Sequence, residues 1–126
     1  MSVLTLADAL EPGVRRWSSS LDADYVRGVV RRDGRRFAHL DGSRVRTVED
    51  LHDALAEALP LPAYYGRNLD ALAECLGDLE GALVLLWDAW EVFASTEPRT
   101  SRVVLALLED SGCTALLRGA GAPRGG

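Results

Sequence analysis

Asp70 and Glu74 are the residues of this 126-residue chain whose type and spacing could carry chemistry. They lie four positions apart, so in a helix their carboxylates stack one turn apart on one side. Such a pair could act as general acid and base or hold Mg²⁺. Two helix-borne carboxylates without further oxygen ligands make a poor cage, and no phosphate-binding loop, metal-ligand motif or nucleophile elbow occurs. We therefore expect no enzymatic activity, no metal and no cofactor, and a binding role for the pair.

The residues around the pair predict a loop that runs into a helix. Gly66 permits backbone angles that a Cβ would forbid, and Asn68 stands where an N-cap would. Apolar residues with helical spacing follow at Leu69, Leu72 and Leu76. Asp78 continues the line of carboxylates, and no Lys or Arg within the helix relieves a repulsion of about 0.2–0.5 kcal/mol per pair. The ridge is either an ordinary solvated face or the surface for a cation-rich partner.

Short motifs beyond this helix extend the pattern. They are Leu51-His52, Leu61-Pro62, Tyr64-Tyr65-Gly66, Asn68-Leu69-Asp70-Ala71-Leu72, Cys75-Leu76, Leu83-Val84-Leu85, Trp87 and Gly112-Cys113. These motifs resemble the barstar family of intracellular ribonuclease inhibitors, and the similarity covers roughly Arg35 to Leu117. The resemblance implies an α/β fold in which a parallel sheet of three strands is flanked by helices. We expect the residues before Arg35 to add an extra N-terminal strand and helix.

The resemblance also implies a function and a site. The loop before Leu69 and the helix that starts there would enter a ribonuclease active site. Asp70 and Glu74 would take the place of substrate phosphates, and Tyr64 would stack on an imidazole or arginine of the enzyme. The residues implied to contact the partner are Tyr64, Gly66, Arg67, Asn68, Leu69, Asp70, Ala73, Glu74, Gly77 and Asp78. The partner would be an extracellular-type microbial ribonuclease, bound 1:1 by a monomer that serves as a bacterial immunity protein, with neither nucleic acid nor a membrane involved. The alternative is a barstar-like interaction module with a non-nuclease partner.

Several positions depart from the barstar pattern. Glu74 stands where barstar carries Asp, Ala73 replaces a Trp, and Arg67 replaces an acidic residue. Leu107 replaces an acid of the last helix, and the turn after the helix that begins at Leu69 is one residue shorter. These differences leave the binding mode intact and the identity of the partner open.

Charge is unevenly distributed along the chain. Residues 1–46 carry nine Arg and six acids, a net +3, whereas residues 47–110 carry three Arg and thirteen acids, a net −10. The acidic block would repel nucleic acid and speed association with basic proteins.

The start of the chain lacks a signal-peptide pattern and no apolar run reaches about 18 residues, so we expect a cytoplasmic protein. Cys75 and Cys113 are expected to be buried free thiols, and His39 and His52 to be structural.

Periodicity and turn residues predict the elements that position the site. We expect residues 1–34 to form an extension packed on the same domain, residues 35–118 to form the barstar-like domain, and residues 119–126 to be a flexible tail. Predicted strands are Gly13–Trp17, Arg35–Asp41, Ala82–Trp87 and Cys113–Leu117. Predicted helices are Val3–Leu10, Asp22–Arg32, the run after Thr47, the run from Leu69 to a turn at Gly77, Asp88–Ala94, and Pro98–Asp110. We expect Thr47 to cap the helix that follows it, and Gly34 and Gly112 to end the helices that precede them.

Some side chains in these elements are assigned to a face. Tyr25 should point inward, and Trp90 and Phe93 should pack in the core. The cluster Arg31, Arg32, Arg35 and Arg36 is either a group of cations at a helix C-terminus or a nucleic-acid patch, and the first is the simpler interpretation.

Overall fold

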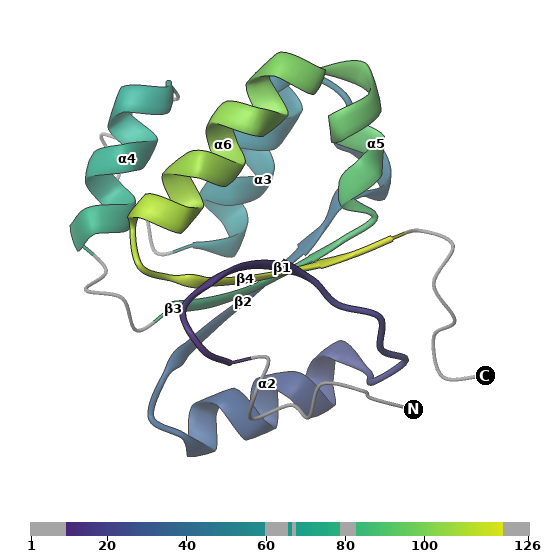
Figure 1. Cartoon of the computed structure of the whole chain (residues 1–126), viewed down its shortest axis with the longest axis vertical. Coiled ribbons are helices and arrows are strands. Elements are labelled where there is room, and N and C mark those ends of the chain that lie inside the picture. Colours follow the sequence, from purple (N-terminus) through teal and green to yellow (C-terminus); the bar gives the residue numbers. More distant parts are fainter. Residues whose placement is uncertain (1–9, 60–65, 67, 79–82, 120–126) are drawn as a thin grey trace.

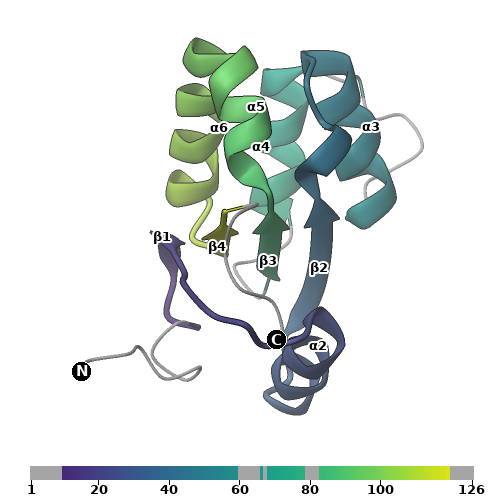
Figure 2. The same cartoon turned by 90° about the vertical axis from the view of Figure 1, so that its right-hand side faces the viewer.

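A parallel four-stranded sheet lies between two layers of helices in the computed structural model, which describes residues 10–59, 66, 68–78 and 83–119 (Figure 1). The strands stand in the order β1-β4-β3-β2. In chain order the elements are β1 (Gly13–Arg16), α2 (Ala23–Arg32), β2 (Arg36–Asp41), the short 3₁₀ helix η1 (Gly42–Arg44), α3 (Val48–Ala58), α4 (Leu69–Asp78), β3 (Leu83–Asp88), α5 (Trp90–Thr96), α6 (Pro98–Asp110) and β4 (Thr114–Arg118). Helix α2 covers one face of the sheet, and α3 to α6 cover the other (Figures 1 and 2). The predicted α/β class and parallel sheet are confirmed.

The central strand β3 is buried on both faces because every one of its side chains meets a layer of helices. Leu83, Leu85 and Trp87 join the core beneath α3 to α6. Val84 and Leu86 point the other way and join a second core against α2. This alternation follows from the two-residue period of a strand. A continuous apolar run is what a strand covered on both sides requires.

The N-terminal segment adds an edge strand and its crossover helix, as predicted. Strand β1 pairs in parallel with β4, with Gly13 opposite Thr114 and Arg16 opposite Leu117. Beyond the strand, the Trp17 N–H donates to the Leu117 carbonyl at 2.8 Å. The edge of the sheet at β4 is therefore closed by the extension.

Helix ends follow the local capping chemistry. Thr47 and Asp50 form a capping box at the start of α3, with the Asp50 N–H donating to Thr47 Oγ1 at 3.0 Å. Gly34, after α2, and Gly112, after α6, have φ of +79° and +78°, which only glycine adopts readily. These three predictions of where helices begin and end are confirmed.

Three details of the prediction are wrong. Tyr25 is 55% exposed, because Val26 and Val30 of α2 already fill the buried face. The helix expected from Asp88 begins at Trp90, because Asp88 is the last residue of β3. Gly77 is not a turn residue, because α4 continues to Asp78.

Two further predictions fall largely on residues the structure does not describe. The helix expected at Val3–Leu10 lies outside the described residues except for Leu10, and so does the tail beyond Gly119. None of the helices in the described part of the chain has the length and apolar character needed to cross a membrane.

Candidate partner-binding site

The start of α4 is fixed by Asn68. Its side-chain Oδ1 accepts from the Ala71 N–H at 2.8 Å, which satisfies one of the free donors of the first turn. Its Nδ2 donates to the Gly66 carbonyl at 3.3 Å. A Cβ on Gly66 would lie 3.1 Å from that Nδ2, so the residue must be small for the loop to close on the cap. The predicted N-cap is confirmed.

One face of α4 anchors the helix on the sheet. Leu72 and Leu76 are buried in the core that also holds Leu83 and Leu85 of β3. Cys75 is buried beside them as a free thiol. Buried leucines are worth about 1.5–3 kcal/mol each, so this face fixes the rotation of the helix about its own axis. The opposite face must then point to solvent.

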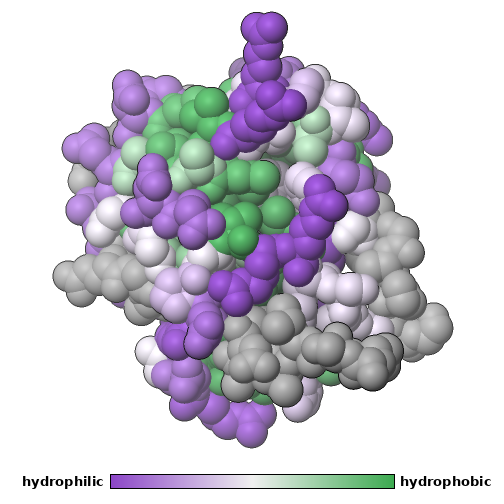
Figure 3. Space-filling view, viewed as in Figure 1, coloured by the Kyte–Doolittle hydropathy of each residue, from purple (hydrophilic) through white to green (hydrophobic). Residues whose placement is uncertain are grey.

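The acidic residues lie on that outer face. Asp70, Glu74 and Asp78 are exposed, and together they form what we call the acidic ridge. Hydrophilic side chains line the edge of the molecule at which α4 lies, on the left of the view in Figure 3. Across the described residues, no Arg or His lies within ion-pair distance of any of the three carboxylates. The ridge is therefore outward-facing and not neutralised by the described part of the chain.

The carboxylates of the ridge affect the pKa of the Cys75 thiol. Burial raises the pKa of its thiol, and the carboxylates of Asp78 and Glu74 raise that pKa further because they repel a thiolate. The thiol is thus poorly suited to nucleophilic chemistry, since the thiolate is the reactive form. Burial likewise raises the pKa of the Cys113 thiol.

The remaining predicted contact residues fall into three groups. Leu69 and Ala73 are half-buried on one flank of α4, and Gly66, Asn68 and Gly77 are exposed. Tyr64 and Arg67 lie outside the described residues. The structure thus places eight of the ten predicted residues on α4 and on the loop that enters it.

A buried polar cluster at the carboxyl end of the sheet was not anticipated from the sequence. Asp88 of β3 stands opposite Arg118 of β4 in the parallel register. Arg118 donates from Nε to Asp88 Oδ1 at 2.6 Å and from Nη2 to Asp88 Oδ2 at 3.0 Å. His39 of β2 donates from Nε2 to Asp88 Oδ2 at 2.8 Å. Burial raises the pKa of Asp88, but these hydrogen bonds and the Arg118 charge outweigh burial and hold the pKa well below its ordinary value.

Arg118 also binds the N-terminal extension, residues 1–34. Its Nη1 donates to the carbonyl oxygens of Leu21, at 2.6 Å, and Ser19, at 3.2 Å, and its guanidinium stacks on the Trp17 ring. A cavity of about 190 Å³ adjoins Asp88, His39 and Arg118. Because Arg118 and Asp88 satisfy one another, this cluster holds elements together rather than offering a reactive group. The signal in the sequence is a charged residue at the end of each of two apolar strands.

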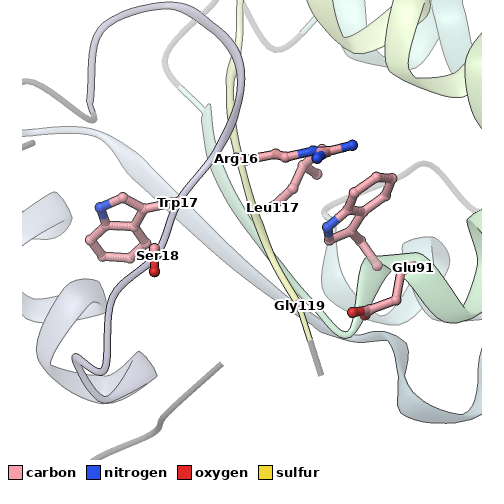
Figure 4. Close-up of a pocket in the computed structure, with 7 residues that line it drawn as sticks. Arg16, Trp17, Ser18, Glu91, Leu117 and Gly119 are labelled. Atoms are coloured by element: carbon pink, nitrogen blue, oxygen red, sulfur yellow. The ribbon is translucent and has the colours of Figure 1, made fainter. Parts of the chain in front are cut away.

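A second hollow of about 470 Å³ lies where β1 and β4 end (Figure 4). Its lining comes from the extension and from the rest of the chain: Arg16, Trp17, Ser18, Trp90, Glu91, Leu117 and Gly119. The Arg16 guanidinium lies over the Trp90 ring, 5.2 Å from its centre. Trp90 is half-buried, packs against the core and lies under a cation, whereas Phe93 is fully buried in the core as predicted.

The cluster Arg31, Arg32, Arg35 and Arg36 extends from the last turn of α2 to the first residue of β2. Arg31 and Arg32 lie in the last turn of α2, where cations are favoured by the helix dipole. Arg35 pairs with Asp33 at 3.0 Å and donates to the Leu10 carbonyl. This arrangement supports the helix-terminus interpretation. Within the described ranges, no group of three or more His, Cys, Asp or Glu is placed to hold a metal ion.

Comparison with known proteins agrees with this architecture. The family model described as Barstar (barnase inhibitor) matches residues 35–119, from just before β2 to just after β4. A Bacillus subtilis (strain 168) protein named "Putative ribonuclease inhibitor YrdF" is 51% identical over 49 residues, which cover 36% of this chain and 54% of that protein. The match thus spans about half the length of that relative. Since the family model covers most of the chain, including three of the four strands, the protein belongs to the barstar family.

Proposed function

We propose that this protein inhibits a small basic ribonuclease by placing the acidic ridge of α4 in the active site of that enzyme. The carboxylates of Asp70 and Glu74 occupy positions that RNA phosphates would take, and the body of α4 blocks access for RNA. Inhibition is then steric and electrostatic, and the protein needs no reactive group of its own. The match to barnase inhibitors and the name of the B. subtilis relative support this proposal.

The observation that carries the proposal is the exposure of the ridge. Asp70 and Glu74 stand on consecutive turns of one helix, and the opposite face of that helix is locked into the core. Their separation is therefore set before any partner arrives, which lowers the entropic cost of binding. Carboxylates that meet Arg or Lys in a dry cleft form charge-assisted hydrogen bonds, the stronger kind.

The charge of the whole chain favours the same partner. The ridge lies within residues 47–110, which carry a net −10. A strongly acidic surface accelerates encounter with a basic protein and repels RNA. We expect the protein to act in the cytoplasm as an immunity protein and to bind its ribonuclease as a monomer.

The test is inhibition of barnase and a panel of other small secreted microbial ribonucleases by the unchanged protein and by the variants Asp70→Ala, Glu74→Ala and Asp70→Ala/Glu74→Ala. We expect each single variant to lose about 2–5 kcal/mol of binding free energy, because it leaves a cation of the enzyme unpaired. Glu57→Ala is the matched control, because it removes an exposed carboxylate from α3 instead. Its effect should be small.

The outcomes separate two function classes. Equal inhibition by the double variant and the unchanged protein contradicts the proposed site. A lack of inhibition across the panel, together with a stable complex with some other protein, identifies an interaction module with a non-nuclease partner. Inhibition that is lost only in the ridge variants supports the proposal.

A further inference from the structure

An exposed aliphatic side chain lies on α6, the helix beside α4. Val103 and Tyr25 are the large hydrophobic side chains that the fold leaves exposed in the described part of the chain, at 44% and 55%. Tyr25 belongs to α2, on the opposite side of the sheet (Figure 1). Val103 therefore stands out on the layer of helices that carries the acidic ridge.

The contacts of α6 show which way Val103 points. Ser101, Val104 and Leu108 form the buried face of the helix. The Glu109 carboxylate accepts the Val14 N–H at 3.1 Å, so the flank with Glu109 faces β1. At about 100° per residue, Val103 and Leu107 fall on the other flank of the buried face, one turn apart.

That other flank faces α4, because α6 packs between β1 and α4 (Figures 1 and 2). Leu107 is half-buried and reaches the core that also holds Leu72 and Leu76 of α4. Figure 3 shows hydrophobic surface over α6, bordered by hydrophilic side chains. The exposed part of α6 next to α4 is thus aliphatic at Val103 and Leu107.

Helix α4 has two further apolar side chains between its buried face and the ridge. Leu69 and Ala73 are half-buried, lie one turn apart, and each directly precedes a ridge carboxylate in sequence. We call Leu69, Ala73, Val103 and Leu107 the aliphatic strip. The strip borders Asp70 and Glu74 without placing a charge of its own beside them.

We infer that the partner-binding surface has two parts, the acidic ridge and the aliphatic strip, and that the ribonuclease partner presents an apolar side chain next to its basic active site. This inference rests on the proposed function. An apolar contact at the border of the charged contacts excludes water from them, which strengthens the ion pairs. It also selects among ribonucleases that share a basic active site, because an enzyme with a charged side chain at that border would have to bury it unpaired.

The test compares Val103→Ser with Tyr25→Ser and Asp70→Ala in inhibition of barnase and the ribonuclease panel, at several salt concentrations. We expect Val103→Ser to weaken inhibition of the cognate enzyme about three- to tenfold, with the same salt dependence as the unchanged protein. Asp70→Ala should weaken inhibition and also reduce the salt dependence, because it removes a charge. Tyr25→Ser should leave inhibition unchanged, and Val103→Leu should preserve it.

Each result has a distinct meaning. If Asp70→Ala weakens inhibition but Val103→Ser matches the unchanged protein, the inference fails while the proposed function stands. If the unchanged protein inhibits none of the ribonucleases, the proposed function fails and the inference with it. A dimer seen by analytical ultracentrifugation that Val103→Ser dissociates would show that the strip covers a second copy, which overturns the inference. Circular dichroism and thermal unfolding of Val103→Ser check that the variant folds.

Discussion

Asp88 and Arg118 face each other in register at the carboxyl ends of β3 and β4, and their buried side chains form a two-point ion pair. The alternation of strand residues turns both side chains toward α2, where Arg118 also binds the backbone at Ser19 and Leu21. One ion pair thus joins two central strands to the segment that follows β1.

We expect Asp88→Asn to lower the free energy of unfolding at pH 7 by about 3–5 kcal/mol, because Arg118 would be left buried without a counter-charge. The pKa of Asp88 is depressed in the folded protein, so its stabilisation is present above the unfolded-state pKa of about 3.9 and is lost as pH falls through the lower folded-state value. Urea unfolding across this range should show the variant and the unchanged protein converging in acid. Asp24→Asn, which breaks the exposed pair with Arg27, should have little effect at any pH.

Removing the cap of α4 should weaken both the fold and the proposed binding. Asn68→Ala loses the hydrogen bond to the Ala71 N–H, and we expect a cost of about 0.5–2 kcal/mol in unfolding free energy. Asn68→Asp keeps an equally good capping oxygen and should retain stability. Chemical denaturation of the two variants measures the difference, and equal losses in both would show that the cap is not the cause.

Gly42 and Gly28 should respond to alanine in opposite ways. A Cβ on Gly42 would lie 2.6 Å from the Asp88 carbonyl oxygen and 2.7 Å from Trp87 Nε1, so Gly42→Ala must displace the end of β3. We expect a loss of about 1–3 kcal/mol, the usual cost of overpacking. Gly28 lies inside α2 with only an ordinary contact to Arg32 at 3.6 Å, so Gly28→Ala should stabilise by up to about 1 kcal/mol. Thermal unfolding of both variants tests the contrast.

The thiol of Cys75 offers a measurement of the ridge that needs no partner. Burial and the carboxylates of Asp78 and Glu74 raise its pKa, in that order of importance. We expect Asp78→Asn, and to a lesser degree Glu74→Gln, to shift the pH dependence of Cys75 alkylation toward lower pH. Mass spectrometry that distinguishes Cys75 from Cys113 supplies the readout, and a pH profile unchanged in both variants would contradict this account.

Local rules were sufficient for most of the fold. Asn68 and Thr47 were predicted as caps because capping depends on residues three positions apart. The both-sided burial of β3 followed from its unbroken apolar run. The same local reasoning placed Tyr25 inward, since periodicity cannot tell which of several apolar residues the available space admits. That depends on how α2 rotates against the sheet.

The candidate site was predictable to a similar degree. The acidic ridge was visible as a four-residue spacing on one helix, and its exposure followed from the leucines opposite. The cluster of His39, Asp88 and Arg118 was not, because three strands far apart in sequence bring these residues together. Only the strand order places the ends of β3 and β4 side by side.

The pairing of β1 with β4 has a consequence for how the chain matures on the ribosome. β4 is the last of the four strands to be synthesised, so β1 leaves the exit tunnel long before its partner exists. Until then one edge of β3 presents unpaired backbone N–H and C=O groups along a mostly apolar strand, which is the kind of edge that recruits other chains. The sheet can therefore close only after β4 has been made, and the slow step in its folding is the formation of these long-range contacts.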